Sequence, residues 1–154
     1  MKTAAEIMDA SVPSVSPDAD ARSAIELLAK TDKGALPVVD EERRVVGIVT
    51  ESDLILSDEE SDLHLPHYLN IMGGVVFVGS MKGFEKRLDK AFATKVSELM
   101  SADPVVVKDY ASAETVARKI ADEHHNHLPV VDEEGRLAGL VTRADALAAL
   151  VANE

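Results

Sequence analysis

Apolar residues recur with helical spacing in some segments of this chain and form short continuous runs in others. These two kinds of segment follow each other in the same order in both halves of the chain. The apolar residues within 21–28 have the i, i+3, i+4, i+7 spacing that is typical of an amphipathic helix, and residues 113–120 repeat it. Each segment is therefore predicted to be a helix with one apolar face against a core. The residues on these faces are Ala21, Ala24, Ile25 and Leu28, and then Ala113, Val116, Ala117 and Ile120.

Short apolar runs bounded by turn residues predict strands around these helices. In the first half, a β-rich stretch at 13–16 precedes the helix and a buried strand is expected at 35–39. After a polar turn at 40–44, the run at 45–50 predicts a returning antiparallel strand, and a second helix is expected after Thr50. Each half thus has the order β-α-β-β-α. In the second half the strands are expected at 104–107, 127–131 and 137–142, with a helix after Thr142.

The two halves are copies of one unit. Every position in the range Thr3–Leu56 has a counterpart 92 positions later without a gap, and "GIVTESD" at 47–53 returns as "GLVTRAD" at 139–145. "LPVVDEE" is identical at 36–42 and 128–134. A unit of this size is small for an independent domain, so we expect the two copies to complete one core together.

This duplication divides the chain into a first repeat over 1–56, an insert over 57–94 and a second repeat over 95–154. The insert has no counterpart elsewhere in the sequence. An acidic loop is expected at 57–62 and a short strand at 75–78. An amphipathic helix leading into the second repeat is expected from the i, i+4, i+8 spacing of Phe84, Leu88 and Phe92.

Composition narrows the classes of partner. The formal net charge is −12, with 46% hydrophobic and 29% charged residues, which is typical of a globular chain. Such an acidic protein is repelled by the phosphate backbone of nucleic acids and by anionic membrane surfaces, so neither partner is expected. The absence of cysteine excludes disulfides and thiolate sites. We find no signal peptide at the start and no apolar run long enough to span a membrane, so a cytoplasmic location is expected.

A threonine and an aspartate stand at the same place in both repeats. A threonine followed three residues later by an acidic residue is the arrangement of a capping box, which begins a helix. The glycine three residues before each threonine lies inside a predicted strand, where glycine often marks a close approach to the backbone. A helix N-terminus beside such a gap can bind a phosphate, and an ionised carboxylate suits paired ribose hydroxyls. A capping function and a ligand function therefore both fit these residues, which are Gly47, Thr50 and Asp53, and then Gly139, Thr142 and Asp145.

With "LPVVDEERRVVGIVTESD" and "LPVVDEEGRLAGLVTRAD" at a fixed offset, the sequence resembles a pair of cystathionine-β-synthase (CBS) domains, also called a Bateman module. The resemblance covers both repeats but not the insert. It implies an α/β (α+β) fold in which two β-α-β-β-α repeats pack sheet to sheet as one pseudo-two-fold module. It also implies two clefts that bind adenosine ligands, commonly AMP, ADP or ATP.

The resemblance also implies which residues would bind the ligand. The aspartate contacts the ribose and the hydroxyl contacts the phosphate, which gives Asp53 with Thr50 in one cleft and Asp145 with Thr142 in the other. The adenine is held by the segment before the first strand and by the residues just before the "LPV" strand. Those residues are Met8, Pro13, Lys33 and Ala35, and then Met100, Val105, His125 and His127.

Three histidines stand just before the second "LPV" strand, at His124, His125 and His127. Imidazolium groups at the C-terminus of a helix interact well with its dipole, which is one interpretation. Their spacing also fits a metal site, but no companion carboxylate cluster fixes a geometry, and we expect no metal. A third interpretation places them at the phosphate, because an anion bound to so acidic a protein needs local positive charge. The candidates for that contact are Lys33, His125, His127 and Arg143.

The leading hypothesis is a regulatory module without enzymatic activity. It needs no cofactor, binds adenosine nucleotides as effectors and acts on a separate, unknown protein, since no output domain is present. The family resemblance also implies a homodimer that pairs through helices. Alternatives are a dimerisation or interaction module with empty clefts, and a binder of S-adenosylmethionine-type ligands. No nucleophile triad, thiol or metal cluster supports an enzyme.

Overall fold

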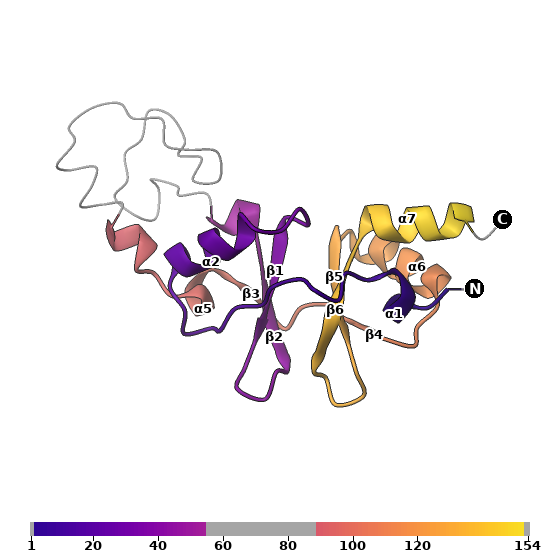
Figure 1. Ribbon diagram of the computed structural model, residues 1–154, viewed down its shortest axis with the longest axis horizontal. Coiled ribbons are helices and arrows are strands. Elements are labelled where there is room, and N and C mark those ends of the chain that lie inside the picture. Colours follow the sequence, from indigo (N-terminus) through magenta and orange to yellow (C-terminus); the bar gives the residue numbers. More distant parts are fainter. Residues whose placement is uncertain (1, 55–88, 153–154) are drawn as a thin grey trace, which may run out of the picture.

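The computed structural model describes residues 2–54 and 89–152. Two β-sheets lie side by side at the centre of the molecule, and helices lie on the outer side of each (Figure 1). One sheet has the order β1-β2-β3 and the other has the order β4-β5-β6. This α+β arrangement of two similar halves is the predicted fold class. The strands are β1 (Ala35–Val39), β2 (Val45–Thr50), β3 (Ser101–Ala102), β4 (Val107–Lys108), β5 (His127–Val131) and β6 (Leu137–Thr142).

Each sheet is built on one of the two predicted hairpins. β1 pairs antiparallel with β2, and β5 pairs antiparallel with β6, with the same register. Ala35 lies opposite Thr50, and His127 lies opposite Thr142. This register places each threonine beside the start of the buried "LPVV" strand, at the edge where the ligand residues are expected.

The helices α2 (Ala21–Leu28) and α6 (Ala113–Glu123) cover the outer faces of these sheets, with the predicted apolar residues turned inward. Their first turns are capped by side chains at equivalent positions of the two repeats. Asp20 accepts a hydrogen bond from the Ser23 N–H, and Ser112 accepts one from the Thr115 N–H. The Ser23 N–H bond is the main cause that lowers the pKa of Asp20 below its ordinary value of 3.8.

The opening segments of the two repeats are exchanged. The short helix α1 (Ala4–Ile7) packs on the second repeat, and α5 (Val96–Leu99) packs on the first (Figure 1). Ala4 is buried in the second core, whereas Val96 is buried in the first. β3 continues from α5 and pairs with β2, and Asp9 forms the matching bridge to Leu140 of β6. Each hairpin is therefore paired along one edge with the opening segment of the other repeat.

This exchange explains the glycines inside β2 and β6. A Cβ on Gly47 would lie 2.4 Å from Met100 Sδ, and one on Gly139 would lie 2.7 Å from Met8 Sδ and 2.8 Å from the Asp9 carbonyl oxygen. The close approach that the glycines permit is thus made by the opening segment of the other repeat. The interpretation that they leave a gap beside a ligand is not needed to explain them.

Three predicted elements differ from the structure. Within 13–16 only Val15 pairs, in a parallel bridge to Val38, and the strand expected at 104–107 is reduced to β4. Prolines in both stretches lack the N–H that a strand interior needs. After Thr50 the chain forms a 3₁₀ turn, η1 (Glu51–Leu54), whereas α7 (Arg143–Ala152) follows Thr142 as predicted.

The insert is described only at its end. Residues 89–92 are helical, as the spacing that includes Phe92 predicts. The expected loop at 57–62 and strand at 75–78, together with Phe84 and Leu88, lie outside the described residues. In the ranges 2–54 and 89–152, no helix is both long enough and apolar enough to cross a membrane.

A third apolar cluster joins the two sheets. Val12, Ala35 and Leu140 are buried together, with Ile48 against them. At the hairpin turns, the Leu137 N–H donates to the Arg43 carbonyl at 2.9 Å, and the Val45 N–H donates to the Gly135 carbonyl at 3.1 Å. The two repeats thus form one pseudo-symmetric module, with clefts at the junction of the sheets.

Candidate functional site

The threonine and aspartate of each repeat are hydrogen-bonded to one another. Asp53 Oδ2 accepts from the Thr50 N–H at 2.8 Å and from Thr50 Oγ1 at 3.1 Å. In the second repeat, Asp145 Oδ2 accepts from the Thr142 N–H at 2.9 Å, and Thr142 Oγ1 accepts from the Asp145 N–H at 3.2 Å. The latter pair is a reciprocal capping box at the start of α7. In each aspartate these bonds use only Oδ2.

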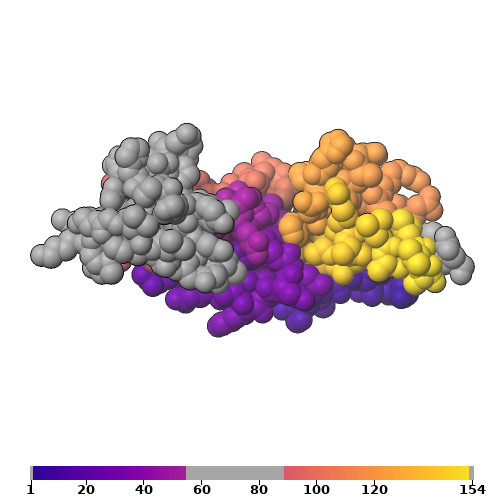
Figure 2. Space-filling view, turned by 90° about the horizontal axis from the view of Figure 1, so that it is seen from above, coloured from indigo at the N-terminus to yellow at the C-terminus, as the bar shows by residue number. Residues whose placement is uncertain are grey.

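The first of two clefts, which we call the Thr50 cleft, has a volume of about 830 Å³. It lies where the end of β2 meets the opening segment of the second repeat. In Figure 2 the magenta end of the first repeat meets the orange and yellow parts of the second at the centre of the face shown. Its lining residues fall in four segments, which are Asp32–Gly34, Ile48 with Thr50–Asp53, Ser101–Val105 and His124–His127.

The second cleft, which we call the Thr142 cleft, has a volume of about 500 Å³. The two volumes fall in the range of about 300–1,000 Å³ that small-molecule sites occupy. Residues from both repeats again contribute to the lining. They are Asp32, Lys33, Asn126, His127, Thr142, Arg143, Ala144, Asp145 and Leu147.

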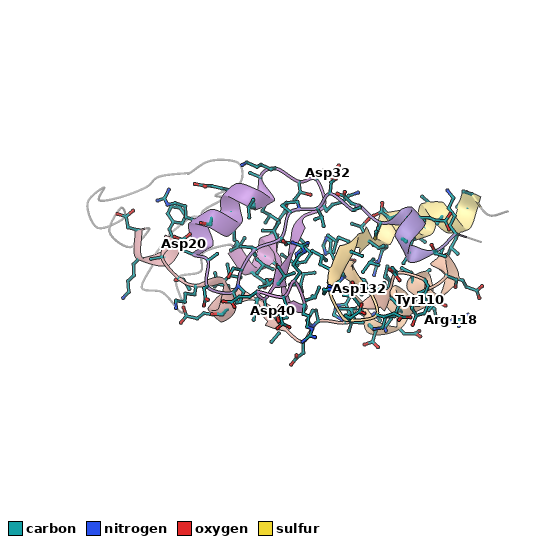
Figure 3. The ribbon with its side chains drawn as sticks, turned by 60° about the horizontal axis from the view of Figure 1, so that its bottom comes forward. Asp20, Asp32, Asp40, Tyr110, Arg118 and Asp132 are labelled. Atoms are coloured by element: carbon teal, nitrogen blue, oxygen red, sulfur yellow. The ribbon has the colours of Figure 1, made fainter. Side chains whose placement is uncertain are left out.

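Residues 32–34 belong to the first repeat and contact the second, and Asp32 and Lys33 line both clefts. Lys33 Nζ lies 3.7 Å from Asp145 Oδ1, and both side chains are about four-fifths buried. His127 Nε2 lies 2.7 Å from the Lys33 carbonyl oxygen. Because a carbonyl only accepts, the hydrogen of this bond is on Nε2. In Figure 3 Asp32 lies at the edge of the sheets that carries the clefts. Asp40 and Asp132 mark the two hairpin turns at the opposite edge.

Glu51 and Arg143 occupy equivalent places in the two clefts. The Glu51 N–H donates to the Gly34 carbonyl at 3.2 Å, and the Arg143 N–H donates to the Asn126 carbonyl at 2.9 Å. The Glu51 carboxylate lies beside Gly34, because Glu51 Oε1 is 3.7 Å from the point where a Cβ on Gly34 would stand. The same backbone position therefore carries a negative charge in one cleft and a positive charge in the other.

The structure brings together one group of the predicted residues and leaves the others outside the clefts. Those that line a cleft are Lys33, Thr50, Asp53, Val105, His125, His127, Thr142, Arg143 and Asp145. Met8 and Met100 instead pack beside Gly139 and Gly47. Ala35 is buried in the cluster between the sheets. These residues, together with Pro13, are absent from the lining of the Thr50 and Thr142 clefts, and their part in ligand binding stays a prediction.

Sequence reasoning missed several residues that line the Thr50 cleft, including Asp32, Glu51 and Asp103. Glu51 could have been found, because the offset between the repeats places it opposite Arg143, which was already a candidate. Asp103 follows β3, which crosses to the sheet of the other repeat. No local pattern in the sequence indicates that crossing.

The histidines do not form a metal site with neighbouring side chains. Within residues 2–54 and 89–152, no group of three or more histidine or acidic side chains has the geometry to hold a metal ion. His124 adopts a left-handed conformation with φ of 56° at the end of α6, which turns the chain toward β5. The segment thus ends α6 and continues into the wall of the Thr50 cleft.

Comparison with known proteins agrees with this architecture. The family model for the CBS domain matches the chain twice, at residues 4–60 and 96–152. CBSX2, a chloroplastic CBS domain-containing protein of Arabidopsis thaliana, is 31% identical over 136 residues, which are 88% of this chain and 57% of CBSX2. This chain thus spans little more than half the length of that relative.

In two further comparisons the match covers a larger share of the related protein. The uncharacterized protein MJ1426 of Methanocaldococcus jannaschii is 31% identical over 139 residues, which are 87% of this chain and 83% of MJ1426. The crystal structure of CBSX2 in complex with AMP matches with a TM-score of 0.69 and 27% identity, over 100% of both chains. The described fold and a nucleotide complex thus occur together in a similar protein.

Proposed function

Since this chain belongs to the CBS domain family and carries two such domains, we propose that it is a regulatory module that binds adenosine nucleotides in its two clefts. In this proposal AMP, ADP or ATP acts as an effector and not as a substrate. A ligand with different affinities for two arrangements of the repeats shifts the population between them. The regulated partner is a separate protein.

The observation that carries this proposal is the second oxygen of each aspartate. Oδ2 of Asp53 and of Asp145 is used in bonds to the neighbouring threonine, while the carboxylate of each lines a cleft. An ionised carboxylate accepts at both oxygens, so Oδ1 can still accept from the ribose hydroxyls. In Asp145 this oxygen also faces Lys33 Nζ at 3.7 Å, and the ribose would share it with the lysine. A cap and a ribose contact are therefore compatible in one residue. The AMP complex of CBSX2 supports the choice of ligand.

We assign the phosphate contact to basic side chains that line the same cleft as each threonine. In the Thr142 cleft, Arg143 and Lys33 are the positively charged residues of the lining. In the Thr50 cleft, His125 is the candidate, because the Nε2 of His127 already donates to Lys33. Charge-assisted hydrogen bonds of this kind are stronger than neutral ones.

We also propose that the module forms a homodimer through α6 and α7. A groove of about 310 Å³ between these helices is lined mostly by apolar residues, among them Ile120, Ala146 and Leu147. Leu147 and Val151 are 55% and 72% exposed and stand one helical turn apart on α7. A groove and protruding apolar side chains on one face are self-complementary, as a two-fold interface requires. Sedimentation of Val151→Glu should then show a weakened dimer, and an unchanged dimer would contradict this interface.

The nucleotide proposal is tested by thermal shift with AMP, ADP, ATP, adenosine and S-adenosylmethionine, and with GMP as the control. A ligand at 100 times its Kd stabilises the folded state by about 2.7 kcal/mol. For a chain of this length each kcal/mol raises Tm by about 2–4 °C, so the shift should be several degrees. GMP should leave Tm unchanged. No shift with any adenosine compound would favour an interaction module with empty clefts.

A further inference from the structure

The Thr50 and Thr142 clefts share a backbone frame but not a charge. Four carboxylates line the Thr50 cleft, from Asp32, Glu51, Asp53 and Asp103. Among the described lining residues of this cleft, Lys33 is the one lysine, and there is no arginine. Lys33 Nζ lies 3.7 Å from Asp145 Oδ1 in the Thr142 cleft. Near neutral pH the described wall of the Thr50 cleft is therefore strongly negative.

The Thr142 cleft is close to charge balance. Its carboxylates are those of Asp32 and Asp145, and they are matched by Lys33 and Arg143. Arg143 stands where the Thr50 cleft has Glu51. Arg143 follows Thr142 in the sequence and lines the same cleft, and a guanidinium suits a phosphate because it can form two parallel hydrogen bonds to it.

The offset between the repeats shows how this difference arises. Lys33 of the first repeat pairs with Asp145 of the second, and the residues at the corresponding positions of the Thr50 cleft are His125 and Asp53. A lysine has thus been exchanged for a histidine at one position and an arginine for a glutamate at another. At both positions the Thr50 cleft has less positive charge than the Thr142 cleft.

We infer that the two clefts select adenosine ligands by charge. The Thr142 cleft takes the nucleoside phosphate, and the Thr50 cleft takes an adenosine ligand whose 5′ substituent is neutral or cationic. This inference rests on the proposed nucleotide function and narrows it, because the phosphate is then bound in the Thr142 cleft and no phosphate contact is expected from His125 in the Thr50 cleft. A carboxylate wall repels a phosphate dianion and attracts a cation at the same position. Because Glu51 and Asp103 are exposed, salt screens this effect, and the titrations are done at low ionic strength. The two ligand sources that fit the Thr50 cleft are a free nucleoside and a sulfonium compound of the S-adenosyl type.

The test is calorimetric titration of the full chain with AMP, adenosine and S-adenosylmethionine, at about pH 8 where imidazole is ordinarily neutral. AMP should occupy one site per chain, with the second site weaker by at least about tenfold, as expected for one or two charge contacts. When AMP saturates the Thr142 cleft, adenosine or S-adenosylmethionine should still bind at one site. Tighter binding of S-adenosylmethionine than of adenosine would identify the cationic source, and equal binding would identify the nucleoside.

Two charge exchanges make the assignment specific. Glu51→Arg should give a second AMP site of at least tenfold higher affinity, and Arg143→Glu should weaken the first AMP site by at least tenfold. Glu41→Arg, in the exposed turn that contains Asp40 at the opposite edge in Figure 3, is the matched control for net charge. It should leave the number of AMP sites unchanged.

The outcomes separate this inference from the proposed function. Two equal AMP sites in the parent chain, together with no change in Glu51→Arg, would overturn the charge selection but leave nucleotide binding intact. If neither AMP, adenosine nor S-adenosylmethionine binds the parent chain, the nucleotide function itself is overturned. A second AMP site that appears in Glu41→Arg as well would show that net charge, and not the cleft wall, controls binding.

Discussion

Leu36 and Leu128 occupy the same position in the two hairpins, and both side chains are completely buried. A few residues further along each copy, Glu51 and Arg143 also share one position, but their side chains are exposed and opposite in charge. The buried leucine is thus the same in both copies, and so are the threonine and aspartate of each cleft, whereas the exposed residue directly after the threonine differs in charge. A single exposed position can therefore give two similar clefts different charges, because exposed charges cost little stability to replace.

The largest effect expected concerns the two halves as separate chains. In the full chain α5 and β3 cover the first sheet, so a fragment of residues 1–56 lacks Val96 and the edge strand at Ser101–Ala102. Such a fragment buries too little apolar surface to offset its conformational entropy. Circular dichroism of the fragment should show a largely unfolded chain. A cooperative thermal melt of residues 1–56 alone would contradict the exchanged architecture.

The equality of the two cores is tested by truncation. Leu36→Ala and Leu128→Ala should each destabilise the protein by about 2–5 kcal/mol, because each leaves a cavity in a fully buried cluster. The two losses should be similar, and each variant should unfold in one transition, since the repeats share their sheets. Urea denaturation measures these quantities. Two separate transitions in either variant would show that the repeats fold independently.

The glycine contacts offer a finer comparison. Gly139→Ala should destabilise more than Gly47→Ala, with losses of about 1–3 kcal/mol from overpacking. A Cβ on Gly139 would lie 2.8 Å from the backbone oxygen of Asp9, whereas on Gly47 the contact below 3.0 Å is with the flexible side chain of Met100. Unfolding free energies from urea melts decide the order. The reverse order would mean that the two opening segments are not held as described.

The smallest effect concerns the equivalent helix caps, Asp20 and Ser112, of which only the aspartate titrates. The Ser23 N–H lowers the pKa of Asp20 in the folded state, so the stabilisation is present above 3.8 and is lost as pH falls through the lower folded value. Relative to Asp20→Ser, the parent chain should therefore lose stability below about pH 4. Thermal melts between neutral and acidic pH measure this difference. A difference that does not depend on pH would exclude a charged cap.

Much of the fold could be predicted from the sequence because its hairpins and helices are local. The i, i+3, i+4 spacing predicted α2 and α6, and the duplicated "LPVV" runs predicted β1 and β5. The exchange of α1 and α5 could not be predicted, because a four-residue helix has no pattern that says which sheet it covers. The glycines were noticed for a close approach, but the approaching group belongs to the distant segments at Met8 and Met100.

Candidate site residues could be predicted where a motif occurs in both repeats. They could not be predicted where contacts between the repeats determine which residues line a cleft. Thr50, Asp53, Thr142 and Asp145 stand out because the motif occurs twice, and all four line a cleft. The position of Lys33 opposite Asp145 of the other repeat depends on how the two sheets meet. The negative wall of the Thr50 cleft has the same origin, since Asp103 arrives from the second repeat.

The central claim, that the aspartates are ligand residues as well as caps, is tested most directly by AMP calorimetry on the double variant Asp53→Glu/Asp145→Glu. Glutamate is favoured at this position of a capping box, so unfolding stability should change by no more than about 0.5 kcal/mol. The longer side chain displaces the carboxylate from the ribose, where each charge-assisted hydrogen bond is worth about 1.5–3 kcal/mol. AMP affinity should fall at least tenfold while Tm stays near that of the parent chain. If the double variant binds AMP as tightly as the parent, Asp53 and Asp145 are caps alone and the account is wrong.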